Sequence, residues 1–180
     1  VKKPVVYEGG EFWGPVINGD YLYIEVVQDS ASEHPDLHID TISHRYREPI
    51  SGAINDSILR ENELLLKKVE ATCHLDIKCY SSWVDYGKGV AEMEYEKNGE
   101  SKVCTGALVM DKSSTFRNWF LTANHCISSN TVANTLIAYF DYTTISCNLG
   151  IAWSDFSVTG ATFKVGSSNS DFSLLELSGK

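Results

Sequence analysis

The chain has few of the features that mark membrane, nucleic-acid-binding or disordered proteins. It contains 4 prolines in 180 residues, no low-complexity tract, and no apolar run near the roughly 18 residues that a membrane-spanning helix needs. Lys and Arg number 15 against 24 Asp and Glu, for a formal net charge of -9. Because nucleic-acid affinity depends on clustered cations, we expect no nucleic-acid partner. The hydrophobic content of 43% suffices for one domain, or for a compact domain with a small module.

The chain begins with Val1 rather than Met and has no signal-like apolar segment, so we expect that an N-terminal piece has been lost. Five cysteines in a chain rich in Tyr, Ser, Thr and Gly suggest an oxidising, secreted setting. Their odd number leaves one thiol over after two disulfides. That thiol is either reactive or paired with a cysteine outside this sequence. The cysteines are Cys73, Cys79, Cys104, Cys126 and Cys147.

Two sets of residues resemble metal ligands, but neither predicts a metal site. Cys73, His74 and Cys79 have no second CxxC or HxxxH cluster nearby to complete four zinc ligands. We therefore favour disulfides over metal binding there. The histidines of the N-terminal third, with two neighbouring aspartates, are interpreted as solvated loop and strand residues. These are His34, His38 and His44 beside Asp36 and Asp40.

The first third of the chain predicts a separate β-rich module over residues 1–56. Asn18-Gly19 lies between Val16-Ile17 and the β-branched and aromatic run Tyr21–Val27, which indicates a hairpin with a type I′ turn. Strong helix formers such as Leu64, Leu65 and Leu66 then predict a linker or short helix over residues 57–72.

Residues 73–180 predict an all-β structure. Lys97-Asn98-Gly99-Glu100 separates two strand-like segments and indicates a second hairpin. Six strands without a long helix favour a small antiparallel barrel or sandwich. The predicted strands cover residues 90–95, 102–110, 119–122, 135–142, 157–165 and 172–177.

Three segments follow one another in a characteristic order. The second of them places His125 directly before a cysteine at the end of an apolar run. The segments are Cys104–Val109, Phe120–Cys126 and Ser170–Leu177. They resemble consecutive motifs of the trypsin-like serine proteases, and most closely those of the bacterial lysyl endopeptidases. The resemblance covers residues 73–180 and, less closely, the N-terminal module.

This resemblance implies an all-β fold: the N-terminal antiparallel β-barrel of the trypsin-like two-barrel fold, with the second barrel absent. It also implies that His125 is the catalytic base and Asp171 the triad aspartate, and it implies no cofactor. The chemistry fits, because a serine hydroxyl needs an imidazole to remove its proton and the imidazole needs a carboxylate on its other nitrogen. A histidine and an aspartate in a β-protein are more often ordinary surface, core or turn residues, but three motifs in order make coincidence improbable. Asp171 lies beside Phe172 and two leucines, so we expect it to be partly desolvated.

By the same resemblance, Cys104 pairs with Cys126 and Cys79 with Cys147. Cys73 would then reach a cysteine in the absent C-terminal half of the protease. The sequence alone leaves a free Cys73 thiol and other pairings open. In the related enzymes the mature chain begins near Cys73, so Lys68 is a candidate processing site.

The sequence ends nine residues after Asp171 and contains no Gly-x-Ser-Gly-Gly-type segment. We therefore expect the N-terminal portion of a secreted serine endopeptidase precursor, which supplies His and Asp but not the serine and is inactive alone. Its expected partners are a peptide or protein substrate and the missing C-terminal protease half. The alternative is a non-enzymatic secreted pseudoprotease or a β-rich binding or adhesion module. The downstream coding sequence, with or without a serine in a Gly-rich turn, would distinguish the two.

Overall fold

The computed structural model describes residues 14, 21–25, 37–39, 42, 75–113, 117–148, 152–154 and 156–178. From residue 75 onward the described chain is mostly β, which confirms the all-β prediction. The module predicted over residues 1–56 and the linker over 57–72 lie almost wholly outside the described residues and stay predictions. Residues 21–25 are described and exposed, and they are not in a strand, although the hairpin prediction included them.

The helices in the described part of the chain are short, and none has more than five residues. They are the 3-10 helix η1 (Ile77–Cys79), α3 (Val84–Gly87) and α4 (Asn130–Asn134). None of these described helices has the length and apolar character needed to cross a membrane. The strands are β1 (Val90–Lys97), β2 (Glu100–Leu108), β3 (Trp119–Thr122), β4 (Ile137–Phe140), β5 (Thr143–Thr144), β6 (Ala152–Trp153), β7 (Phe156–Thr159), β8 (Ala161–Ser167) and β9 (Phe172–Leu177).

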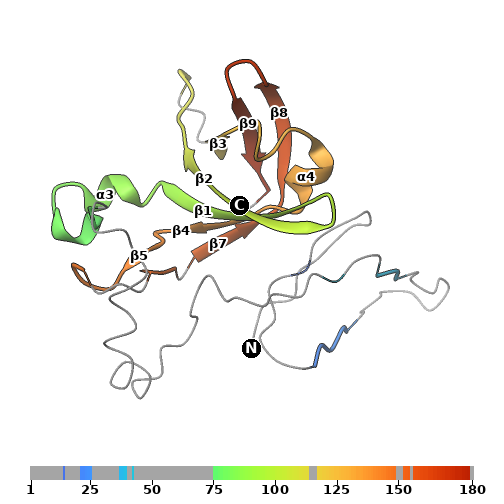
Figure 1. The fold of residues 1–180 in the computed structure, drawn as a ribbon, viewed down its shortest axis with the longest axis horizontal. Helices are drawn as coiled ribbons and strands as arrows, with labels where there is room; N and C mark the ends of the chain where they lie inside the picture. The colour runs from blue at the N-terminus through green and yellow to red at the C-terminus, as the bar shows by residue number, and fades with distance from the viewer. Residues whose placement is uncertain are drawn as a thin grey trace.

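Seven strands form one antiparallel sheet in the order β7-β4-β1-β2-β3-β9-β8, and β5 pairs with β6 separately. The two edge strands β7 and β8 are consecutive in the chain, with only Gly160 between them. The sheet therefore curls so that its first and last strands meet. In Figure 1, β8 and β9 run steeply across the direction of β1, β4 and β7, as this curl requires.

Gly160 makes the corner between the two edge strands. Its φ of +81° lies in the left-handed region that favours glycine. Its amide donates to the Leu136 carbonyl at 2.7 Å, and its carbonyl accepts from the Ser178 amide at 3.0 Å. The single strand predicted over residues 157–165 is therefore wrong: the chain turns at Gly160 and forms two strands on opposite edges.

The hairpin predicted at Asn98-Gly99 is confirmed. Both residues have positive φ, 58° for Asn98 and 77° for Gly99, as a type I′ turn requires. Lys97 pairs with Glu100 across the turn, and the ladder between β1 and β2 continues without interruption to Val90 and Ala107.

The core lies inside the curled sheet and follows the two-residue period of its strands. Ala91, Met93 and Tyr95 of β1 are buried, as are Leu175 and Leu177 of β9. The helix α4 and the segments around it close the core next to β8. The further buried apolar residues are Phe120, Cys126, Ile127, Ala133, Leu136, Ile137, Ala138, Phe140 and Ala161.

Replacement of Gly160 by Ala tests the corner, with Gly99→Ala as the matched control at a second positive φ. Each substitution places a side chain in the left-handed region, which costs about 1–2 kcal/mol. At Gly99 a new Cβ would meet nothing within 4 Å, whereas at Gly160 it would lie 3.3 Å from the Ser178 hydroxyl. We expect urea denaturation to show a larger loss of unfolding free energy for Gly160→Ala. Equal losses would contradict the proposed role of the corner.

Candidate functional site

The pairing of β3 with β9 brings the two predicted catalytic residues together. Thr122 at the end of β3 lies opposite Ser173 near the start of β9. Beyond this pair, β3 continues into the turn that carries His125, and β9 is preceded by the turn that carries Asp171. Because β3 and β9 are antiparallel, the two turns lie at the same end of this strand pair. His125 and Asp171 are therefore close together although 46 residues separate them in the sequence.

Asp171 binds His125 through both carboxylate oxygens. Oδ1 accepts from the backbone amide of His125 at 2.8 Å, and Oδ2 lies 2.7 Å from the ring Nδ1. One carboxylate thus fixes both the backbone and the ring of the histidine. When Nδ1 carries the proton and donates to Asp171, Nε2 on the other side of the ring is the basic nitrogen. This arrangement suits the removal of a proton from a hydroxyl group.

Asp171 is partly desolvated, as expected, because about half of its side chain is covered. Its side chain is 49% exposed and that of His125 is 71% exposed, since the turns project from the sheet edge beyond the buried core. The hydrogen bond from the His125 side chain, and then that from its backbone amide, hold the pKa of the Asp171 carboxyl below its usual value of 3.8. The backbone amide of Asn124 acts in the same direction. Hydrogen bonds, rather than burial, therefore determine the direction of the pKa shift of this aspartate.

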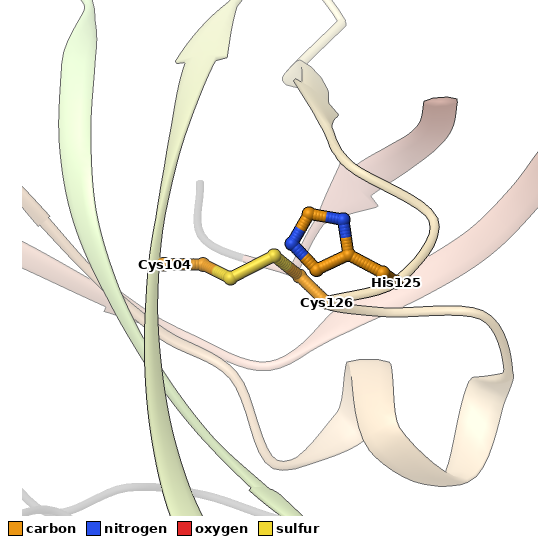
Figure 2. Close-up of side chains that lie close together, drawn as sticks. All are labelled: Cys104, His125 and Cys126. Atoms are coloured by element: carbon orange, nitrogen blue, oxygen red, sulfur yellow. A yellow bond between two sulfur atoms is a disulfide. The ribbon is translucent and has the colours of Figure 1, made fainter. Parts of the chain in front are cut away.

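A disulfide between Cys104 of β2 and Cys126 anchors the histidine turn next to His125. Figure 2 shows the imidazole of His125 beside this disulfide. The sulfur atoms of both cysteines and a ring nitrogen lie within 4.8 Å of one another, a spacing that would suit a metal ion. Metal ligation by cysteine requires the thiolate, and here both sulfurs are bound in the disulfide, so these residues do not fit a metal site.

Three residues that hold the histidine turn were not predicted as site residues. Lys97 at the end of β1 donates from Nζ to the carbonyls of His125 and Cys126, at 2.6 and 3.2 Å. The Asn124 side chain donates to the hydroxyl of Ser173 at 3.0 Å. One pattern could have revealed Ser173: it shares the inward phase of Leu175 and Leu177 and is a polar residue at a core position.

The second disulfide joins Cys79 to Cys147 and lies away from the histidine turn, between η1 and the segment after β5. Asp76 reinforces this link, because its Oδ2 accepts from the Thr144 hydroxyl and the Asn148 amide, both at 2.7 Å. Cys73 and Lys68 lie outside the described residues. Ser129 near His125 caps the start of α4, where its hydroxyl accepts from the Val132 amide.

The fold and the site define an all-β protein with a curled antiparallel sheet that presents an aspartate-bound histidine beside a disulfide. Comparison with known families makes the relation specific: the family model for "Lysyl endopeptidase, C-terminal domain" matches residues 68–180. The chain therefore belongs to the lysyl endopeptidase family, a family of peptidases, which confirms the resemblance found in the sequence.

One curated relative is the lysyl endopeptidase of Pseudomonas aeruginosa, which is 28% identical over 177 residues. The alignment covers 92% of this chain and 37% of the relative. The chain thus spans little more than a third of the length of the relative that it matches.

The lowered pKa of Asp171 predicts a specific acid dependence. The ionised carboxylate contributes stability above pH 3.8, and that contribution is lost as the pH falls through the lower pKa of the folded state. We expect wild type to be more stable than Asp171→Asn at pH 5, with the difference shrinking below pH 3.8 in urea denaturation series. Asp141→Asn is the matched control, because Asp141 also has a φ of 50°. A pH-independent difference, or the same trend in the control, would contradict this assignment.

Proposed function

We propose that this chain is the N-terminal portion of a secreted serine endopeptidase precursor. In this proposal His125 is the general base and Asp171 is the acid that orients it. One observation carries the proposal: a single carboxylate holds both the His125 amide and its ring Nδ1, at 2.8 and 2.7 Å. Membership of a peptidase family supports peptide bonds as the substrate class.

The proposed mechanism follows from the two sides of the imidazole ring. Nε2 takes the proton of a serine hydroxyl as that oxygen attacks the peptide carbonyl, and later returns the proton to the leaving amine. Asp171 keeps the proton on Nδ1 and stabilises the imidazolium while Nε2 is protonated. The 71% exposure of the His125 side chain leaves room for a nucleophile and a substrate at the ring.

The nucleophile in this proposal comes from chain outside these 180 residues. Ser128 and Ser129 follow His125 too closely to form a separate nucleophile turn, and Ser129 caps α4. The limited coverage of the longer relative supports a contribution from further sequence. We accordingly propose that the 180-residue polypeptide alone shows no peptide hydrolysis, since it also contains no Gly-rich segment for an oxyanion hole.

Secretion and a covalent link to the rest of the protease are further parts of the proposal. Two disulfides among the four described cysteines support an oxidising compartment. The fifth cysteine, Cys73, is proposed to pair with a cysteine of the C-terminal protease half.

Removal of the base from the complete gene product tests the proposed activity. We expect His125→Ala to lower kcat for a peptide amide substrate by about 10⁴- to 10⁶-fold, because the serine hydroxyl then has no proton acceptor. His38→Ala is the control, a histidine substitution in the N-terminal module. Active-site titration would normalise both rates. An inactive wild type whose coding sequence lacks the serine would instead support the pseudoprotease or adhesion alternative.

Processing after Lys68 is proposed to release the N-terminal module, and the start of the family match at residue 68 supports this position. We expect N-terminal sequencing of the secreted protein to begin at Val69. Lys68→Gln should abolish that start, because it removes the proposed cleavage residue, whereas the neighbouring control Lys67→Gln should retain it. A mature chain that begins far from Val69 in the wild type would refute the site.

A further inference from the structure

Ser173 is a buried polar residue that contacts the histidine turn at two points. Its side chain lies on β9 and is 0% exposed. Its hydroxyl donates to the carbonyl of Ile127 at 2.6 Å and accepts from the side-chain amide of Asn124 at 3.0 Å. Asn124 precedes His125 and Ile127 follows it by two residues. One hydroxyl therefore holds the backbone on one side of the histidine and a side chain on the other.

The same segment carries the aspartate. Asp171 lies two residues before Ser173, so a shift of β9 relative to the histidine turn would disturb the Asp171 contacts and the Ser173 contacts together. Asn124 contributes twice, because its backbone amide also acts on the Asp171 carboxylate. The hydroxyl of Ser173 and the carboxylate of Asp171 thus bind the histidine turn at separate points, and both belong to the segment 171–173.

The neighbouring strand leaves space for this network. Gly166 of β8 lies opposite Ser173, and a Cβ at Gly166 would lie 2.7 Å from the Asn124 side-chain nitrogen and 2.8 Å from the Ser173 hydroxyl. The same Cβ would also lie 2.8 Å from the backbone carbonyl oxygen of Phe172. The Asn124–Ser173 hydrogen bond and the close approach of the β9 backbone therefore both exclude a side chain at Gly166.

We infer that Ser173, together with Asn124, is a positioning residue that keeps His125 in register with Asp171. This inference rests on the proposed function of the His125–Asp171 pair. The Ser173 hydroxyl bonds to the Asn124 side chain and the Ile127 carbonyl rather than to the imidazole or the carboxylate, so it acts through the turn that carries His125. A displacement of about 1 Å at a catalytic base can lower a rate by about 100-fold, so such a residue affects kcat without contacting substrate.

The test uses the complete gene product and compares Ser173→Ala, Asn124→Ala and the double variant. We expect each single variant to lower kcat by about 10- to 100-fold with KM changed less than about two-fold, because the base is displaced while substrate contacts remain. The double variant should be no worse than the more damaging single variant within about two-fold, because both remove the same hydrogen bond.

Ser154→Ala is the matched control for the loss of a serine hydroxyl. The Ser154 hydroxyl also lies within hydrogen-bond distance of two carbonyls, those of Phe140 and Phe156, and its single proton can be donated to either, at the β4–β7 side of the sheet. We expect this variant to keep the wild-type kcat per titrated active site. Wild-type kcat in both Ser173→Ala and Asn124→Ala, or multiplicative losses in the double variant, would overturn the inference.

A second measurement separates this inference from the proposed function. The His125 backbone amide donates to Asp171, so its hydrogen exchange reports the register between the histidine turn and the Asp171 segment. This exchange can be measured by NMR in the 180-residue chain. We expect exchange at least about 10-fold faster in Ser173→Ala and Asn124→Ala than in wild type and Ser154→Ala. If the complete wild-type protein lacks peptidase activity, the proposed function fails while this measurement still decides the inference. Unchanged exchange in both variants would overturn it.

Discussion

The register between β3 and β9 is the constraint on which the site depends. The pair Thr122 and Ser173 ends a short ladder, and the chain segments beyond it carry the histidine and the aspartate. A slip of one residue would turn Ser173 and Leu175 away from the core, so burial of the β9 side chains fixes the register. The geometry of the histidine–aspartate pair is thus a consequence of core packing in the middle of the sheet. The disulfide to Cys104 and the contacts from Lys97 then hold the same turn from β2 and β1.

The site lowers the pKa of Asp171 while leaving about half of its side chain exposed. A desolvated carboxylate would need compensation for lost hydration, whereas Asp171 retains partial solvent access and accepts directed hydrogen bonds from His125. The His125 ring is exposed to solvent. In the proposed function, a further part of the protease would cover this exposed surface. The buried Ser173 hydroxyl, which bonds the Ile127 carbonyl, is one of the groups that hold this exposed turn in place.

The sequence predicted those features that depend on neighbouring residues. Asn98-Gly99 identifies its hairpin because the positive φ angles are a local requirement. The corner at Gly160 was missed, since a β-branched run on both sides looks like one strand until the sheet closes around it. The partial desolvation of Asp171 was predicted correctly from its neighbours, but the hydrogen bonds from His125 that lower its pKa depend on a residue 46 positions away. The contact between Asn124 and Ser173 spans 49 residues, a distance at which periodicity carries no information about side-chain pairing.

The position of β9 has a consequence for the order of folding. It is the last described strand in the sequence, yet it lies between β3 and β8 in the sheet. During synthesis, β1 to β4 can therefore pair, and Cys104 and Cys126 can join, before any residue of β9 has emerged. Until it does, β3 presents an unpaired edge, a known template for intermolecular association. The high sequence separation of this pairing predicts that the addition of β9 to the sheet, and with it assembly of the histidine–aspartate pair, is the slow step for a nascent chain.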